Sequence, residues 1–277
     1  MGIASDISSD WDASLAALAW QFDAGVDETL CETPIDRYGL PDPQPVVRAA
    51  PVQAPPQAQR GAAKPAPPPE VKVEAIDPVA LARAAAGSAS SVEDLREAVL
   101  NFEHCEMKKG ARNTVFGDGN PKARVMVIGD MPGRDEDLAG QPFAGDEGQI
   151  LDRLLGFIGL SRQSPDTEAA VYLSNLIFWR PLGDRLPPPE DVAMMRPFLE
   201  RHIALVDPAM IVVTGNLALE ALTGERRLLR ARGAWQTALG RPLLPLLPPS
   251  MLRSAADRRA TWGDLLSLKA RLRAAKE

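Results

Sequence analysis

Residues able to do chemistry gather between positions 124 and 148. The apolar run 125–128 is too short for a buried helix, and the turn sequence Gly-Asp-Met-Pro-Gly follows it at 129–133. Three acids at 135–137 and an aromatic residue, Phe143, come next. A buried strand that ends in such a loop places these side chains where open α/β sheets bind ligands. We therefore expect the site of this protein at this loop.

The same loop lacks the patterns of two common nucleotide-binding sites. It has no G-x-G-x-x-G, and no acid follows on a second strand to hold a ribose. It also has no Gly-Lys-Ser/Thr, which ends a Walker loop. The loop must therefore serve another kind of ligand.

Further segments accompany the loop in a fixed order. They are GQPFAG at 140–145, YLSN at 172–175 followed by Arg180-Pro181, and RPFL at 196–199. Together with GDMPG and Glu136-Asp137, they resemble the motifs of the family 4 uracil-DNA glycosylases, the iron–sulfur branch of the uracil-DNA glycosylase superfamily. The resemblance covers residues 102–273. It implies an enzyme of base excision repair that flips uracil out of DNA and hydrolyses its N-glycosidic bond.

The resemblance also assigns roles to single residues. Phe143 would stack on the flipped base, and Asn175 would read the edge of uracil and reject the amino group of cytosine. Asp130 stands where the family has glutamate, which is one methylene longer, and would orient water or stabilise the sugar cation. The pocket would also be lined by Gly129, Met131, Pro132 and Gly133.

Each of these residues has a plainer interpretation when it is taken alone. Phe143 is also typical of a core aromatic residue, and Asn175 of a cap at a strand end. Asp130 is also typical of a solvated loop acid. For the acids at 135–137, the solvated loop is the interpretation we favour.

Arginines are frequent towards the C-terminus. They are Arg226, Arg227, Arg230, Arg232, Arg253, Arg258 and Arg259. In the family the corresponding segments flank the pocket and touch phosphates, so Arg232 and Arg253 are the expected DNA contacts. A solvated helix face or turn is the alternative. The net charge of -6 argues against a nucleic-acid partner, but it is segregated, because residues 1–42 hold one base, Arg37, among many acids.

A histidine is missing where the family has one. Aligning Leu252-Arg253 with the family's Leu-Leu-Arg puts Leu247 at the histidine that hydrogen-bonds the departing uracil oxygen. His104 lies beside Cys105, and we expect His202 at the surface of a helix. Losing such a donor typically costs on the order of a hundredfold or more in rate. Slow or absent turnover is therefore an open alternative.

The cysteines also depart from the family. The chain has two, Cys31 and Cys105, too few and too far apart in sequence for a disulfide framework or a metal site. The family holds a [4Fe-4S] cluster with four cysteines. At those positions this chain has Phe102, Cys105, Trp179 and Met195, so Cys105 alone is retained. We predict no cluster and no metal, with apolar packing in its place.

A parallel sheet would position these motifs. Apolar runs at 125–128, 171–173 and 210–213 alternate with helical patterns and lack a solvent-facing period. Helices are expected at 77–86, 92–102, 147–158, 188–206, 216–223 and 255–273. Residues 113–116 are a candidate edge segment, and residues 117–120 are interpreted as a turn. The predicted fold class is α/β, a central parallel sheet of about four strands flanked by helices, as in uracil-DNA glycosylases.

Composition divides the chain into three parts. Residues 41–69 are rich in Pro, Ala, Gln and Arg, a composition that cannot form a packed core. We expect an amphipathic helix segment at 1–40, a disordered Pro/Ala-rich linker at 41–75, and the glycosylase-like domain at 76–277. The helix expected at 11–22 either docks back on this domain or binds another protein.

No signal peptide and no long uncharged apolar run is present. We therefore expect a cytoplasmic monomer with no membrane partner, whose partner is DNA containing uracil. Two other functions stay open. One is a pocket that binds uracil or damaged DNA without cleaving it, and the other is a scaffold that recruits a repair protein through residues 1–40.

Overall fold

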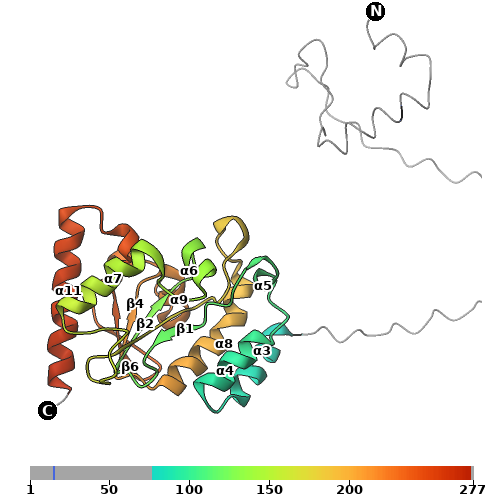
Figure 1. Cartoon of the computed structure of the whole chain (residues 1–277), viewed down its shortest axis with the longest axis horizontal. Helices are drawn as coiled ribbons and strands as arrows, with labels where there is room; N and C mark the ends of the chain where they lie inside the picture. The colour runs from blue at the N-terminus through green and yellow to red at the C-terminus, as the bar shows by residue number, and fades with distance from the viewer. Residues whose placement is uncertain (1–14, 16–76, 276–277) are drawn as a thin grey trace, which may run out of the picture. The chain divides into compact units, whose positions relative to one another are not determined.

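A six-stranded sheet forms the centre of the part of the chain that the structure describes (Figure 1). The computed structural model describes residue 15 and residues 77–275 of the 277-residue chain. The strand order is β1-β3-β2-β4-β6-β5. The four inner strands are parallel: β3 (Val171–Asn175), β2 (Val125–Gly129), β4 (Met210–Val213) and β6 (Arg241–Pro245). Two short antiparallel strands, β1 (Gly117–Gly119) and β5 (Gln236–Ala238), form the edges.

Helices cover both faces of the sheet. The longer ones are α3 (Pro78–Ser88), α4 (Val92–Leu100), α7 (Gly145–Phe157), α8 (Pro189–Val206), α9 (Asn216–Thr223) and α11 (Ala255–Ala274). The shorter ones are α5 (Met107–Gly110), α6 (Arg134–Ala139), α10 (Leu228–Ala231), and the 3-10 turns η1 (Leu182–Asp184) and η2 (Pro249–Met251). In Figure 1, α3, α4 and α8 lie together, apart from α7 and α11.

The sheet divides the core into two layers. Every residue of β2 is buried, and successive side chains of a strand point to opposite faces. Met126 and Ile128 pack in the layer that contains the buried residues of α3, α4, α8 and α9. Val125 and Val127 pack in the layer of α7 and α11. This burial on both sides explains why the inner strands are continuous apolar runs.

Polar caps set where several helices begin. The Asp77 carboxylate accepts hydrogen bonds from two backbone N–H groups at the start of α3. Ser91 and Ser254 begin α4 and α11 with reciprocal bonds to Asp94 and Asp257, three residues further on. These caps satisfy donors that the first turn of a helix leaves unpaired.

The structure confirms the expected parallel sheet and corrects its edges. Residues 117–120 were interpreted as a turn, but Gly117–Gly119 form β1, because they pair with residues 172–174 of β3. Residues 113–116 form no strand, although the Val115 N–H donates to the Phe178 carbonyl at 2.8 Å. The acids at 135–137 belong to α6 and not to an open loop.

The predicted N-terminal helix segment and the Pro/Ala-rich linker fall almost wholly outside the described residues. The boundaries at 40 and 75 therefore stay predictions. Within residues 77–275, no helix combines the length and the apolarity needed to cross a bilayer.

Candidate functional site

A cavity of about 570 Å³ lies at the carboxyl ends of the inner strands. Parallel pairing sets Gly129, the last residue of β2, beside Asn175, the last residue of β3. Thr214, directly after β4, also lines the cavity. The remaining lining residues come from the loop after β2, from α6 and the start of α7, and from the turn after β6: Asp130, Met131, Gly133, Arg134, Asp135, Glu136, Phe143, Ala144, Asp146, Glu147, Pro248, Pro249 and Ser250.

Phe143 and Asn175 meet at Gly129. A Cβ added at Gly129 would lie 2.3 Å from Asn175 Oδ1 and 3.0 Å from Phe143 Cζ. Both contacts are closer than real Cβ atoms normally make, so the carboxamide and the ring fill the space that glycine leaves open. The structure thus brings the two expected recognition residues together in one cavity.

Asn175 lines this cavity and has an unused side-chain donor. The residue is 1% exposed, and its Nδ2 has no hydrogen-bond partner among the described residues. Leaving a buried amide donor unpaired costs about 1 to 3 kcal/mol. An orphaned group at the wall of a cavity therefore indicates a ligand with a matching acceptor.

Phe143 adopts a backbone conformation that is rare for its residue type. Its φ of 52° lies in the left-handed region, which costs a bulky residue on the order of 1 to 3 kcal/mol. The Phe143 N–H donates to Glu136 Oε1, and its carbonyl oxygen accepts from Arg162 Nη2 at 3.1 Å. The same carbonyl oxygen packs against Gly148, where an added Cβ would lie 1.6 Å from it. Several neighbours thus fix the backbone of Phe143, from which the ring projects.

Glu136 supports the loop from inside, and the expectation of a solvated acid was wrong for it. Its Oε2 accepts from the Gly133 N–H at 2.6 Å, which caps α6. Burial raises the pKa of Glu136, and the N–H groups of Gly133 and Phe143 oppose that rise. The Asn175 amide also favours the charged form, although Nδ2 does not reach hydrogen-bond geometry.

The expectation of a solvated loop acid was also wrong for Asp137. It is 6% exposed, and its Oδ1 accepts the N–H groups of Arg112 and Asn113 at 2.9 and 3.1 Å. Asp135 is exposed but close to Gly145, where an added Cβ would lie 2.5 Å from Asp135 Oδ2. Of the three acids, Asp135 alone is exposed as expected.

Asp130 faces the start of α9. Its Oδ1 accepts the Ala218 N–H at 2.8 Å, and the carboxylate covers Gly215, where an added Cβ would lie 1.8 Å from Oδ1. Burial raises the pKa of Asp130, while the backbone N–H groups of residues 216–218 lower it. A carboxylate at a helix N-terminus is favourably placed. Asp130 lines the cavity, but one of its oxygens is already engaged.

Some of the other residues expected to line the cavity do so, and some do not. Gly129, Met131 and Gly133 line the cavity, whereas Pro132 is buried beside it and does not. Leu247, at the position of the family histidine, is 2% exposed and does not line the cavity either. The turn after β6 instead contributes Ser250, whose side chain is exposed.

The two arginines expected at DNA differ in their surroundings. Arg253 is exposed, and its Nε donates to the Ser250 carbonyl at 3.2 Å, next to the cavity. Arg232 is half-buried and pairs with Asp264, 2.6 Å away. Its guanidinium thus already has an anionic partner, which weakens the expectation of a phosphate contact there.

The positions of the cluster cysteines belong to the hydrophobic core. Phe102, Cys105, Trp179 and Met195 are all buried in the same layer as α8. The Phe102 ring makes an edge contact with Phe198, with ring centroids 5.2 Å apart. Burial raises the pKa of the Cys105 thiol to about 11, which disfavours a ligating thiolate. Phenyl and indole rings cannot bind iron, so these residues do not fit a tetrathiolate cluster.

The expectation that His202 lies at the surface was wrong. It is fully buried in α8 and stacks on Phe116, with ring centroids 4.3 Å apart. Its Nε2 lies 3.0 Å from the Tyr172 hydroxyl, and its Nδ1 lies 3.4 Å from Ser174 Oγ. Burial lowers the pKa of His202 to about 3, so it is neutral in the folded protein. His202 is part of the core and not of the cavity.

A larger hollow of about 770 Å³ lies between α3, α8 and α9. Two of its arginines already pair with glutamates, Arg196 with Glu200 at 2.7 Å and Arg226 with Glu220 at 2.8 Å. It contains no orphaned buried group of the kind that Asn175 presents. Chemistry and not size therefore singles out the cavity at Gly129 among the described residues.

The comparisons with known proteins point to the same cavity. The model of the uracil DNA glycosylase superfamily matches residues 116–266, which include all of the cavity-lining residues. The type-4 uracil-DNA glycosylase of Thermotoga maritima is 32% identical over 184 residues, 64% of this chain and 93% of that protein.

Two archaeal relatives match a shorter region. The type-4 uracil-DNA glycosylase of Archaeoglobus fulgidus is 36% identical over 130 residues, 47% of this chain and 62% of the relative. That of Pyrobaculum aerophilum is 34% identical over 131 residues, 47% of this chain and 64% of the relative. The chain thus spans less than two thirds of the length of these two proteins. The family model, the relatives and the sheet that carries the motifs together show that the chain belongs to the uracil DNA glycosylase superfamily, in its type-4 branch.

Proposed function

We propose that this protein excises uracil from DNA in base excision repair, as a uracil-DNA glycosylase. The single observation that carries the proposal is the pairing of Phe143 and Asn175 across one cavity, with Asn175 Nδ2 unpaired. The names of the relatives support the same substrate. A base must leave the duplex before an enzyme can act on its glycosidic bond, and a cavity of about 570 Å³ has room for one base.

Asn175 has the donor and the acceptor needed to choose uracil. Its Nδ2 would donate to uracil O4, and its Oδ1 would accept from uracil N3–H. Cytosine reverses both groups, with an amino donor at C4 and an acceptor at N3. Binding cytosine would therefore set the Nδ2 donor against the amino donor and the Oδ1 acceptor against the N3 acceptor. Such buried, unsatisfied pairs are strongly unfavourable.

Phe143 supplies the flat face of the cavity. An aromatic ring that stacks on an extruded base stabilises it by about 1 to 3 kcal/mol. Because the backbone of Phe143 is held by Glu136 and Arg162, the ring is set in place before the base arrives. Such pre-organisation reduces the free energy lost when the base binds.

Hydrolysis replaces the bond between C1′ and N1 of uracil by a bond between C1′ and a water oxygen. The electron pair of the broken bond leaves with uracil, and the proton released by water ends on the base. Asp130 follows Gly129 directly and lines the cavity, and we propose that its second carboxylate oxygen, Oδ2, orients this water or stabilises the sugar cation. Arg253, exposed beside the cavity, is the phosphate contact that we favour.

We further propose that the protein works without an iron–sulfur cluster, although members of its branch normally carry one. Three of the four positions hold Phe102, Trp179 and Met195, and all of them are packed in the core. Large apolar side chains can hold the same helices and loop together by packing. The protein purified without exposure to oxygen should contain no stoichiometric iron and show no absorbance band near 400 nm. A stoichiometric iron content would overturn this part of the proposal.

The excision assay tests the proposal directly. Single-stranded DNA with one uracil is incubated with the protein, treated with alkali to cut at abasic sites, and separated by length. Cuts at uracil are expected in DNA that contains uracil, and none in matched strands that contain thymine or cytosine. An Asn175→Ala variant controls for contaminating activity. Equal cutting by wild type and variant would contradict the proposal.

A second candidate function is binding of uracil or damaged DNA without cleavage. The observation that favours it is Leu247, which is buried and apolar where the family places a histidine donor. The same assay together with a binding measurement on the same strands separates the two, because a binding protein would retain strands with uracil and leave them uncut. A protein partner for residues 1–40, a cytoplasmic location and a monomeric state stay predictions.

A further inference from the structure

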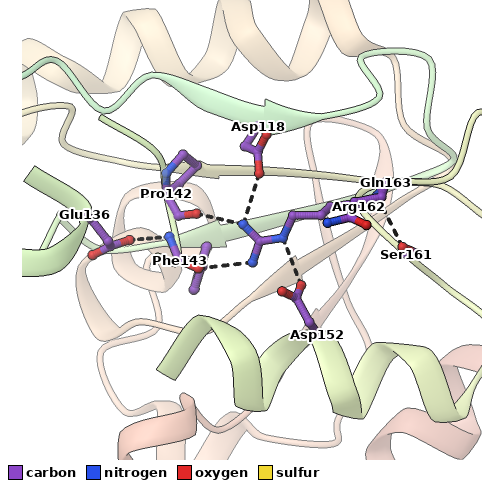
Figure 2. Close-up of polar contacts among 8 residues, drawn as sticks. All are labelled: Asp118, Glu136, Pro142, Phe143, Asp152, Ser161, Arg162 and Gln163. Carbon is purple, nitrogen blue, oxygen red and sulfur yellow. Dashed lines mark hydrogen bonds and ion pairs between the residues drawn. The ribbon is translucent and has the colours of Figure 1, made fainter. Parts of the chain in front are cut away.

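Arg162 joins separate parts of the fold at the Phe143 loop, as Figure 2 shows. Its guanidinium donates to Asp152 Oδ1 at 2.8 Å and to Asp118 Oδ2 at 3.0 Å. It also donates to the carbonyl oxygens of Pro142 and Phe143, both at 3.1 Å. Asp152 belongs to α7 and Asp118 to β1, so the loop is tied to a helix and to the edge of the sheet.

The geometry explains why an arginine stands here. The guanidinium is planar and presents its donors in a fixed fork, whereas the lysine ammonium is a point charge on a flexible stem. At Arg162, Nε and both terminal nitrogens are engaged, and the side chain is 12% exposed. The two aspartates balance its charge, which leaves the guanidinium able to hold neutral carbonyl groups in a half-buried place.

The loop needs such support because its backbone is strained. Phe143 has positive φ, and a free loop would relax towards the allowed region with φ below zero. The hydrogen bond from the Phe143 N–H to Glu136 fixes one side of the residue, and Arg162 fixes the other side through the carbonyl oxygen. Rotation of Phe143 out of the left-handed region would break these contacts.

We propose that Arg162 is a positioning residue for base recognition, which holds the Phe143 ring in the orientation that stacks on the extruded uracil. It rests on the proposed function, and it adds a residue that lies outside the cavity lining. Arg162 acts on the substrate only through Phe143. Its effect must therefore disappear when the ring is absent.

A double-mutant cycle tests this dependence. The probe is single-stranded DNA with one 2′-fluorinated deoxyuridine, in which fluorine slows breakage of the glycosidic bond, so that binding is measured at equilibrium. Arg162→Lys is expected to weaken binding about tenfold or more, as loss of hydrogen bonds from a charged donor does. In a Phe143→Ala background, the same change is expected to alter binding less than about twofold. An equal loss in both backgrounds, or no loss in either, would overturn the proposal.

Arg124 offers a matched control. It is a similarly covered arginine, 17% exposed, which pairs with Glu168 at 2.7 Å at the opposite end of β2. Arg124→Lys should leave binding of the probe unchanged. If Arg124→Lys and Arg162→Lys weakened binding equally, a general loss of stability would explain both, and the positioning role would be refuted.

Amide hydrogen exchange separates failure of this inference from failure of the proposed function. If wild type does not prefer the uracil probe over a thymine strand, the proposed function fails. The hold of Arg162 on the loop at Pro142 and Phe143 can still be measured. Exchange in the segment 141–148 should then be about tenfold faster in Arg162→Met and in Arg162→Lys than in wild type, and unchanged in Arg124→Lys. Unchanged exchange in both Arg162 variants would refute the claim that Arg162 holds this loop in place.

Discussion

Replacing Gly129 by alanine disturbs both recognition side chains with a single methyl group. The new Cβ would lie 2.3 Å from Asn175 Oδ1 and 3.0 Å from Phe143 Cζ. The backbone itself accepts alanine, because Gly129 is not among the glycines with positive φ. The substitution therefore acts on the cavity and not on the path of the chain.

The size of the effect follows from these distances. To reach an ordinary contact, Asn175 Oδ1 must move by about 1 Å, since real Cβ atoms essentially never lie closer than 3.0 Å to such a neighbour. A displacement of about 1 Å in a recognition group costs about a hundredfold in rate. Crowding in a well-packed place also lowers the free energy of unfolding by about 1 to 3 kcal/mol.

The assay compares kcat/KM on uracil-containing single-stranded DNA with urea unfolding of the same preparations. We expect Gly129→Ala to lose about a hundredfold in kcat/KM at a temperature where it stays folded. Gly263 in α11 is the matched control, because a Cβ there meets nothing within 4 Å. Gly263→Ala should keep its activity and gain up to about 1 kcal/mol of stability.

One result would refute this reasoning. If Gly129→Ala remains folded and keeps kcat/KM within about threefold of wild type, Asn175 and Phe143 do not form the recognition site. Equal losses in Gly129→Ala and Gly263→Ala would point to a general effect of handling or folding.

Further predictions concern the core and the arginines. Because burial lowers the pKa of His202 from 6.5 to about 3, the folded state resists a proton that the unfolded chain accepts below about pH 6.5. This group should lower the free energy of unfolding by about 2 kcal/mol between pH 7 and pH 5, and His202→Gln should remove that part of the pH dependence in urea titrations. Arg253→Gln should reduce the slope of log affinity against log salt for single-stranded DNA by about 0.7, without changing stability. Arg232→Gln should leave that slope unchanged but destabilise the fold by about 1 to 3 kcal/mol, because Asp264 loses its partner; a changed salt slope would show that Arg232 does contact phosphate.

The sequence predicts three of the four inner strands and most long helices because their signals are local, but it does not predict β6 (Arg241–Pro245). The run 125–128 and the run 210–213 are apolar on both faces, and each became a buried strand. The helix at 216–223 was predicted with the right ends, since Gly224 follows it in the left-handed conformation. The meeting of Gly129 and Asn175 then follows from parallel pairing of neighbouring strands.

Features that depend on distant partners were missed. Gly117–Gly119 has no strand propensity, and it is a strand because β3 pairs with it. Asp137 is buried because backbone N–H groups some 25 residues earlier in the chain bind it. Arg162 stands alone in a polar segment, and no local pattern shows that aspartates from two other elements surround it.

His202 could have been placed correctly. Phe198, Leu199, Ile203 and Val206 surround it at helical spacing, and all of them are buried. A histidine inside such an apolar stripe is in the core by the same periodicity that places its neighbours there.

Discrimination between uracil and cytosine tests the central claim most directly. Binding to single strands that carry 2′-fluorinated deoxyuridine or 2′-fluorinated deoxycytidine at one position is compared for wild type and for Asn175→Ala. The account predicts that wild type prefers uracil by at least about tenfold and that Asn175→Ala loses the preference. Equal binding of both strands by wild type, or a preference that survives in Asn175→Ala, would contradict it.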